Sequence, residues 1–253
     1  MVTAIITGAS SGLGIEFAKE INKKYPQIES FWLIARRKEK LEELAKVLGE
    51  DKCFILPLDL TDENSFASLE QMLTDAKPEV EILVNNAGFG KMGDFSEVET
   101  QQSVDQIKLN CMGLTALTGA VLPYMQENSK IINISSIASF APNTRLTVYS
   151  STKAYVTSFS KGLRAELKKR KIKVTAVCPG PMDTEFLAVA NISEGSSFTF
   201  DTLPRVKPQK VAKGAVKAVE KNKAIYTPGA FYKFYRVLAK VLPHCIVMKL
   251  CKV

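Results

Sequence analysis

Short apolar runs rich in Ile and Val alternate along this chain with longer amphipathic segments. Runs of the first kind are typical of buried strands, and segments with apolar residues at helical intervals are typical of helices. Their alternation predicts an α/β fold with one doubly wound parallel sheet and helices on both faces. Strands are expected at residues 4–6, 31–34, 53–56, 82–84, 131–134, 174–177 and, as a possible seventh, 224–227, and helices at residues 14–25, 39–48, 63–76, 103–125 and 149–170.

The length of 253 residues is enough to bury a substantial core, and no repeat or linker divides the chain. We therefore expect one domain over residues 1–253. The five cysteines are widely spaced and form no C-x-x-C pair, which favours neither a disulfide framework nor a zinc site and fits a reducing, cytoplasmic setting. No signal peptide and no apolar run of roughly 18 residues is visible, so no membrane span is expected.

The net charge of +8 is concentrated at one end of the chain. Residues 205–253 contain twelve Lys or Arg and one acidic residue, a net charge of +11, whereas the rest carries 22 basic and 25 acidic residues, a net charge of −3. A basic tail can attract anionic substrates, membrane surfaces or nucleic acid, but solvated lysines are the simplest explanation. No nucleic-acid-binding signature is present, so no nucleic acid partner is expected.

The first expected strand ends in the stretch T-G-A-S-S-G-L-G, residues 7–14, and a helix is expected directly after it. Glycines at such a junction let the backbone turn sharply and let a pyrophosphate approach the N–H groups of the helix N-terminus. This placement predicts a dinucleotide-binding, Rossmann-like fold. The expected contacts are Gly8, Ser10, Ser11, Gly12, Leu13 and Gly14.

Taken together, six motifs make the chain similar to the classical short-chain dehydrogenases/reductases. They are the glycine stretch, N-N-A-G at residues 85–88, Asn110, N-I-S-S ending at Ser136, Y-S-S-T-K at residues 149–153, and C-P-G-P-M-D-T at residues 178–184. They occur in the family's order and cover the chain as far as about residue 185. The resemblance implies an oxidoreductase that transfers a hydride between a nicotinamide and a carbonyl or alcohol carbon.

The resemblance also implies a catalytic tetrad. Its members here are Asn110, Ser136, Tyr149 and Lys153. The family's usual spacing between serine and tyrosine selects Ser136, with Ser135 as the alternative and Ser139 as a further nearby serine. By the same analogy, Tyr149 donates a proton, Ser136 hydrogen-bonds the substrate oxygen, and Asn110 holds a water that links Lys153 to solvent. No metal is required, and the single histidine, His244, lies outside every motif.

Tyr149 would need help to act near neutral pH, because a free tyrosine has a pKa of about 10. Lys153 follows four residues later, on the same helix face, where an ammonium would favour the phenolate. A fall of about 3 units requires roughly 4 kcal/mol. One charge at about 4 Å and an effective dielectric near 20 supplies that order of energy. We therefore expect Lys153 to lower the pKa of Tyr149.

Cofactor preference is read where the second strand ends. An acidic residue about 20 positions after the glycine stretch would favour NAD, but Ala35 stands there and Arg36 follows. A guanidinium suits a 2′-phosphate, so NADP(H) is predicted, with Arg37 as a second contact. By family analogy the remaining contacts are Tyr149 and Lys153 together with Asp59, Leu60, Asn86, Ala87, Gly88, Pro179, Gly180, Met182 and Thr184, while Asn85 could be mainly structural.

The substrate pocket is expected from Phe89 and Gly90, residues 139–146 and a lid over residues 185–203. Its apolar residues suggest a hydrophobic ketone, sterol or acyl substrate, although a helix packing on the core would look the same. The alternatives are a non-catalytic NADP-sensing or binding protein and an epimerase or dehydratase of the wider family. A homodimer or homotetramer is expected. The candidate lining residues are Phe186, Leu187, Val189, Phe198 and Phe200.

The variable segment 229–253 is basic and amphipathic. On a helix, Lys233, Arg236 and Lys240 would lie along one side, and an apolar set could share the other. We favour a packing role, over the substrate pocket or at a subunit interface, with peripheral contact to an anionic membrane as the alternative. Pro243 should break or kink the helix. The apolar set is Phe231, Phe234, Tyr235, Leu238 and Leu242.

Overall fold

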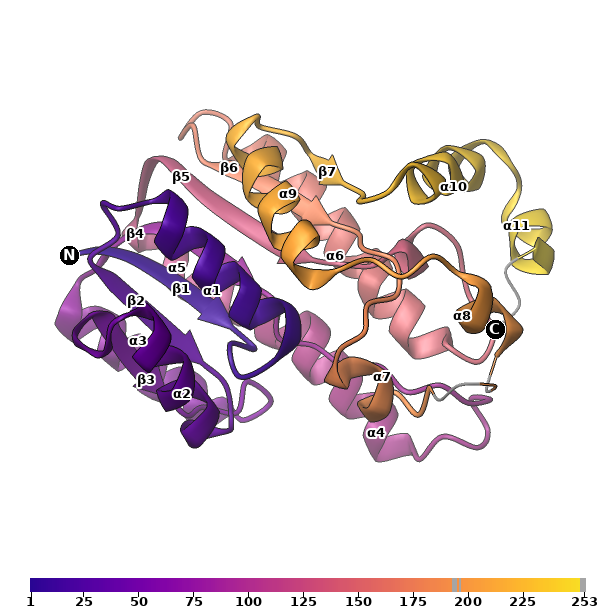
Figure 1. Ribbon diagram of the computed structural model, residues 1–253, viewed down its shortest axis with the longest axis horizontal. Coiled ribbons are helices and arrows are strands. Elements are labelled where there is room, and N and C mark those ends of the chain that lie inside the picture. Colours follow the sequence, from indigo (N-terminus) through magenta and orange to yellow (C-terminus); the bar gives the residue numbers. More distant parts are fainter. Residues whose placement is uncertain (193–194, 196, 251–253) are drawn as a thin grey trace.

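The computed structural model describes residues 1–192, 195 and 197–250 (Figure 1). Its seven strands form one sheet in the order β3-β2-β1-β4-β5-β6-β7, and every neighbouring pair is parallel. This confirms the predicted doubly wound, Rossmann-like sheet and its seventh strand. The strands are β1 (Val2–Thr7), β2 (Ser30–Ile34), β3 (Cys53–Leu56), β4 (Glu79–Asn85), β5 (Met125–Ile134), β6 (Lys173–Val177) and β7 (Ile225–Tyr226).

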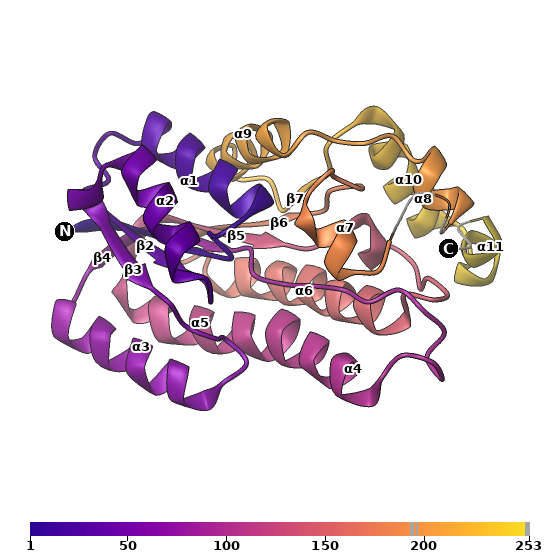
Figure 2. The same cartoon turned by 60° about the horizontal axis from the view of Figure 1, so that its bottom comes forward.

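Helices cover both faces of the sheet (Figure 2). The helices α1 (Gly12–Lys24), α2 (Lys38–Leu48) and α9 (Pro208–Glu220) lie on one face, and α3 (Glu63–Ala76), α5 (Leu114–Val121) and α6 (Thr147–Glu166) lie on the other. Each layer encloses its own apolar cluster, because the buried strands present apolar side chains to both faces. The fully buried Phe17 and Val211 belong to the first cluster, and Leu69 and Leu117 to the second.

The helix predicted over residues 103–125 differs from the structure in two ways. Its path is α4 (Thr100–Ile107), a π-helical turn η2 (Lys108–Gly113), α5 and a 3₁₀ turn η3 (Leu122–Tyr124). Met125 then begins β5, so the predicted helix end was wrong by one residue and the strand starts earlier than expected. Pro123 lies in the 3₁₀ turn, where its missing N–H and fixed φ suit the end of a helical run.

Half of the twelve Lys and Arg residues of the segment 205–253 lie in two helices, at residues 208–220 and 230–241. Helix α9, which the sequence reading did not include, buries Val211, Ala215 and Val219 and leaves its lysines exposed. These three lysines of α9 form a solvated face of the kind that the sequence predicts. Pro243 separates α10 (Ala230–Val241) from α11 (His244–Leu250), as predicted. The remaining short elements are η1 (Glu50–Lys52), η4 (Ile137–Ser139), α7 (Glu185–Val189) and α8 (Phe198–Thr202).

Within the described part of the chain, no helix is long and apolar enough to cross a membrane. Cys53, Cys111, Cys178 and Cys245 are free thiols, and Cys251 lies outside the described residues.

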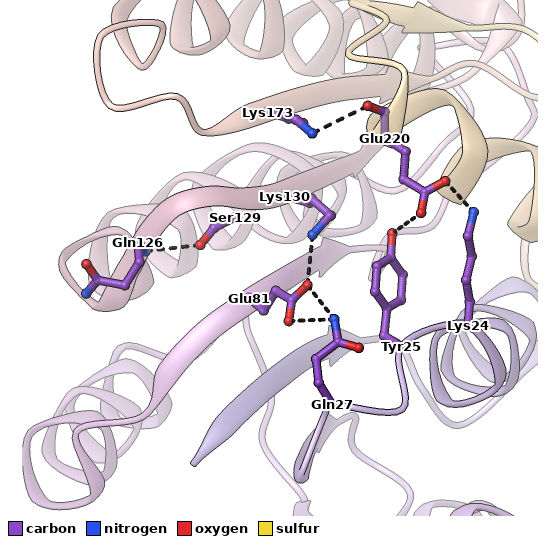
Figure 3. A network of polar contacts seen from close by, with 9 residues as sticks. All are labelled: Lys24, Tyr25, Gln27, Glu81, Gln126, Ser129, Lys130, Lys173 and Glu220. Atoms are coloured by element: carbon purple, nitrogen blue, oxygen red, sulfur yellow. Dashed lines mark hydrogen bonds and ion pairs between the residues drawn. The ribbon is translucent and has the colours of Figure 1, made fainter.

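Charged groups form a network at the amino edge of the sheet (Figure 3). Lys130 Nζ donates to Glu81 Oε1 at 2.8 Å and lies 4.9 Å from the centre of the Tyr25 ring. Tyr25 Oη donates to Glu220 Oε1 at 3.1 Å, and Lys24 pairs with the other oxygen of the same carboxylate. Burial raises the pKa of the Glu220 carboxyl, but the hydrogen bonds from Lys24 and Tyr25 outweigh it, so the net shift is downward. The network joins α1, β4, β5 and α9 at the edge opposite the cleft described next.

Candidate active site

The glycine stretch forms a tight loop between β1 and α1. Gly8 and Gly12 have φ angles of +63° and +49°, which glycine adopts without strain. A Cβ on Gly14 would lie 2.1 Å from the Gly8 carbonyl oxygen, so only glycine lets the first turn of α1 approach β1 this closely. Gly14 therefore lies behind the loop and outside the cleft lining, unlike the direct contact predicted for it. The loop leaves the N-terminus of α1 open toward the cleft.

Thr7 braces this loop, a role that sequence reasoning missed. Its hydroxyl oxygen accepts hydrogen bonds from the backbone N–H groups of Asn86 and Ala87, both at 2.9 Å. The Asn86 side chain donates in return to the carbonyl oxygens of Thr7 and Gly8, at 3.0 and 3.2 Å. A hydroxyl residue at the strand end just before the first glycine was the available signal. The ends of β1 and β4 are thus fixed against each other.

Tyr149, Ser136 and Lys153 meet at the carboxyl end of β5. Tyr149 and Lys153 lie in the first two turns of α6, and Ser136, just after β5, has its hydroxyl beside Tyr149. Lys153 Nζ donates to the Ile134 carbonyl oxygen at 2.9 Å and lies 5.8 Å from the centre of the Tyr149 ring. Both side chains are buried. A proton donor, a hydroxyl partner and a cation therefore share one buried corner.

The electrostatics of this corner differ from the sequence-based expectation. Burial raises the pKa of Tyr149 to about 12, with the hydrogen bond from Ser136 opposing part of the rise. Burial also lowers the pKa of Lys153 to about 8. The predicted fall in the pKa of Tyr149 is therefore wrong: desolvation of the phenolate dominates, and Lys153 is not among the groups that lower the pKa.

The neighbouring serines have other partners. Ser135 Oγ donates to the Lys153 carbonyl oxygen at 2.7 Å, and Ser139 Oγ donates to the Ser136 carbonyl oxygen at 2.7 Å. Thr157 bonds to both of these hydroxyls. Ser135 and Ser139 thus hold the backbone on either side of Ser136, whose hydroxyl is the one beside Tyr149.

Asn110 lies in the π-helical turn and joins two elements of the site. Its side-chain nitrogen donates to the Phe89 carbonyl oxygen at 2.8 Å and to Thr152 Oγ1 at 3.0 Å, and its oxygen accepts from the Phe89 N–H at 3.0 Å. Both amide hydrogens are therefore used, and this side chain can offer a water only its oxygen. Asn85 is buried and donates to Asn133 Oδ1 at 2.8 Å, consistent with a structural role.

The two arginines after β2 have different surroundings. Arg36 is exposed, and its guanidinium lies 3.8 Å from Asp59 Oδ2. Arg37 donates to Glu185 Oε2 at 2.7 Å and to Ser10 at 3.3 Å. Arg37 thus connects the glycine loop to the start of α7, whereas Arg36 is the cation with more freedom to meet a ligand. The second oxygen of Asp59 accepts two hydrogen bonds from Thr61.

One cleft of about 900 Å³ runs along the carboxyl ends of the strands and gathers these groups. Ser136, Tyr149 and Lys153 line it together with every predicted cofactor residue except Gly14, while Asn110 lies just behind the lining. Its lining thus extends from the ends of β1, β2 and β3 to those of β4, β5 and β6. The cofactor residues in the lining are Gly8, Ser10, Ser11, Gly12, Leu13, Arg36, Arg37, Asp59, Leu60, Asn86, Ala87, Gly88, Pro179, Gly180, Met182 and Thr184.

The end of the cleft beyond Tyr149 is largely apolar. Phe186 packs on Tyr149 with ring centres 5.5 Å apart. Gly90 lies outside the lining, directly against Tyr149, because a Cβ there would be 2.8 Å from a ring carbon. The side chain of Phe198 lies outside the described residues. The apolar and aromatic lining residues here are Phe89, Leu146, Phe186, Leu187, Val189, Phe200, Leu203, Phe231, Tyr232 and Tyr235.

The fold and the cleft together define an oxidoreductase of the dinucleotide-binding α/β class. A nicotinamide dinucleotide fits the residues present, because glycines in the loop let a ligand approach the N-terminus of α1 and the cleft continues from that loop to Tyr149. Among the described residues, no group of three His, Cys, Asp or Glu side chains is arranged to hold a metal ion.

Comparison with known proteins gives the family. The model of the short chain dehydrogenase family matches residues 2–195. The chain therefore belongs to the short-chain dehydrogenase family, as its motifs predicted. A fatty acyl-CoA reductase of Acinetobacter baylyi is 33% identical over 233 residues, which cover 87% of this chain and 73% of that protein.

Two solved structures show the same architecture. A short-chain dehydrogenase from Sphingobium yanoikuyae in complex with NADPH is 29% identical, with a TM-score of 0.78 over 96% of this chain and 97% of that one. A 3-ketoacyl-(acyl-carrier-protein) reductase from Brucella melitensis complexed with NADH is 27% identical, with a TM-score of 0.77 over 90% and 96%. Both are nicotinamide complexes, with different cofactors.

Proposed function

We propose that this protein is an NADP(H)-dependent reductase of a hydrophobic carbonyl compound, such as a ketone, sterol or acyl derivative, and that it also catalyses the reverse alcohol oxidation. The observation that carries the proposal is the buried contact between Tyr149 and Ser136 at the junction of the dinucleotide cleft with its apolar end. The similarity to a fatty acyl-CoA reductase and to a 3-ketoacyl reductase supports an acyl or lipidic substrate.

In the reducing direction, Tyr149 Oη gives its proton to the developing alkoxide, and Ser136 Oγ orients the substrate oxygen through a hydrogen bond. NADP(H), when bound, supplies the hydride and, once oxidised, a positive charge near the phenol. Lys153, fixed by the Ile134 carbonyl, stabilises the phenolate that remains and has donors left for a ribose hydroxyl. Asn110 positions this corner by tying Phe89 to Thr152. The cleft end lined by Phe186 and Leu187 excludes water from the reacting atoms.

Tyr149→Phe tests the assignment, because it removes the proton donor and keeps the ring. NADPH consumption with a panel of hydrophobic ketones and aldehydes should fall at least about a hundredfold. NADPH affinity, followed by cofactor fluorescence, should change little. Near-normal turnover in a folded Tyr149→Phe protein would contradict the proposed acid. Tight NADPH binding without turnover of any carbonyl by the unmodified protein would favour a cofactor-binding protein instead.

The preference for NADP(H) rests on Arg36 and the absence of an acidic residue at Ala35. Arg36→Leu should weaken NADPH binding at least about tenfold and leave NADH binding nearly unchanged, since only NADPH carries the additional phosphate. Arg37→Leu is the matched comparison, because Arg37 already binds Glu185 and Ser10. If Arg36→Leu lowered the affinities for NADPH and NADH equally, Arg36 would not bind the 2′-phosphate. The contact would then belong to Arg37, or the protein would have no preference for NADP(H).

We further propose one catalytic domain, in a cytoplasmic homo-oligomer, with residues 185–203 covering the substrate. The free thiols of the described cysteines are compatible with a reducing compartment. Oligomerisation is supported by large apolar side chains exposed on α4, η2 and α6, namely Val104, Ile107, Met112 and Tyr155. Light scattering should give a dimer or tetramer that Ile107→Glu reduces to monomers, and a monomeric unmodified protein would refute this part.

A further inference from the structure

Helix α10 carries an exposed apolar face. Phe231, Phe234, Val237 and Val241 are 53%, 66%, 57% and 73% exposed. Their spacing of three, three and four residues places them on one side of the helix. The helix instead packs through Tyr232 and Ala239, which are 1% and 5% exposed and lie on the opposite side. The predicted helix is therefore present, but the predicted apolar set is divided. Tyr235, Leu238 and Leu242 are half-buried, whereas Phe234 is exposed and Phe231 is partly exposed at the rim of the cleft.

Two lysines border this face. Lys233 and Lys240 are exposed on its flank, while Arg236 turns inward and donates to Thr227 Oγ1 at 3.3 Å. Residues 221–253 contain no acidic residue at all. The single acid after residue 205, Glu220, is paired with Lys24 at the amino edge of the sheet. The apolar face therefore lies in a purely basic part of the chain.

The charge pattern distinguishes between two possible partners of this face, a second copy of the chain and an anionic bilayer. If two copies associated through α10 about a two-fold axis, each would bring the same lysines to the interface, with no acid on α10 or α11 to compensate. An anionic bilayer has the opposite properties, because it accepts phenylalanine and valine side chains at its acyl boundary and attracts lysines to its headgroups. Charge complementarity thus favours a lipid surface over a second copy.

We propose that α10 docks this protein on anionic lipid bilayers, through an apolar face consisting of Phe231, Phe234, Val237 and Val241 and through the flanking Lys233 and Lys240. Phe231 also lines the cleft, next to Tyr232 and Tyr235. In Figure 1 α10 and α11 lie at the same end of the molecule as α7 and α8. Docking would bring the substrate end of the cleft to the bilayer, where a lipidic carbonyl is dissolved. This delivery rests on the proposed function, whereas the docking does not.

Sedimentation with vesicles tests the docking on the full chain. The protein should bind vesicles of phosphatidylglycerol and phosphatidylcholine at low salt, bind weakly to phosphatidylcholine alone, and dissociate as salt rises. The triple variant Phe234→Ser, Val237→Ser, Val241→Ser should lower partitioning at least about tenfold. Lys233→Gln and Lys240→Gln should each lower it about fivefold. The matched control, Lys46→Gln with Val47→Ser on α2, replaces an exposed lysine and an exposed valine elsewhere and should change nothing.

The possible outcomes separate the docking from the enzyme's chemistry. NADPH binding by the triple variant should remain normal, which shows that the fold is kept. Failure of the unmodified protein to sediment with anionic vesicles at low salt would overturn the proposal, and so would equal binding by the triple variant. A change in oligomeric state of the triple variant, without any vesicle binding by the parent, would show that α10 is a subunit interface. None of these readouts depends on carbonyl reduction.

Discussion

The two edges of the sheet use buried polar groups in different ways. At the amino edge, Lys130 and Glu81 face each other, and Glu220 takes bonds from both Lys24 and Tyr25 (Figure 3). At the carboxyl edge, Lys153 is more deeply buried, yet its described hydrogen bond goes to the neutral Ile134 carbonyl oxygen, whereas that of Lys130 goes to a carboxylate. The first edge satisfies its charges within the protein, and the second keeps donors and acceptors directed at a cleft.

This comparison has an energetic meaning. A group whose partners are all in the protein contributes to stability, whereas a group held ready for a ligand contributes less and is available for chemistry. Changes at the amino edge should therefore alter stability more than turnover, and changes at the carboxyl edge should do the reverse. Three variants or conditions test this separation, in order of decreasing effect.

The largest effect is expected from the pH dependence at the carboxyl edge. Burial lowers the pKa of Lys153 to about 8, so this side chain loses its proton as the pH rises above that value. For reduction, kcat/KM with NADPH as the varied substrate reports the free enzyme and should fall tenfold per pH unit above 8, about a hundredfold by pH 10. A flat profile up to pH 10 would show that the charge of Lys153 is not needed.

Deprotonation of Lys153 between pH 8 and pH 10 should not destabilise the fold. Its folded-state pKa lies below the unfolded value of about 10.4. Between these values the unfolded chain binds the additional proton, so this residue's contribution to stability rises with pH. Tyr149 acts in the opposite sense only above about pH 10, because its pKa is raised to about 12. Circular dichroism at pH 9 to 10 checks that the fold is retained.

At the amino edge, Glu81→Leu should cost about 2–3 kcal/mol of unfolding free energy, because it leaves the mostly buried Lys130 cation without its partner. Turnover per folded molecule should stay normal. Glu127→Leu is the matched control, since its pair with Lys171 is more than half exposed and should be worth less than about 0.5 kcal/mol. Urea unfolding gives both values, and similar losses in the two variants would contradict the distinction.

The smallest effect concerns a glycine beneath the catalytic ring. Gly90→Ala places a Cβ 2.8 Å from Tyr149 Cδ2, so the ring must shift, and kcat should fall about tenfold. Gly162→Ala is the control, because no atom lies within 4 Å of its added Cβ. Within the C-terminal part of α6 that change should stabilise the protein by about 0.5–1 kcal/mol and leave kcat unaltered. Parallel kinetic and thermal measurements distinguish the two glycines.

The sequence was most informative where local pattern and tertiary structure agree. Six strands, five of them buried, and the glycine loop were recognisable because apolar runs and glycine placement reflect backbone requirements directly. Helix α9 was missed although Pro208 starts it and Val211, Ala215 and Val219 recur at helical spacing, because its interspersed lysines made the segment resemble a solvated basic tail. The π-helical turn at Lys108–Gly113 has no such pattern, since it depends on how Asn110 reaches Phe89 and Thr152.

The site shows the same division between local and long-range information. The family resemblance implied that Ser136, Tyr149 and Lys153 act together, and the structure places them in one corner. The sign of the Tyr149 pKa shift could not be predicted, because it depends mainly on how deeply the fold buries the phenol. The ion pair between Arg37 and Glu185 joins residues that are far apart in the sequence, so the residues around either one do not predict it.

The strand order has a mechanical consequence. Because β1 lies beside β4, the chain before residue 77 forms one side of the sheet, the chain after it forms the other, and a single seam joins the two sides. The cleft spans that seam, from Arg36 on one side to Tyr149 on the other. A dinucleotide lying across it would act as a brace between two lobes. Melting temperature should therefore rise with NADPH concentration, which makes thermal shift a direct readout of cofactor occupancy that needs no knowledge of the substrate.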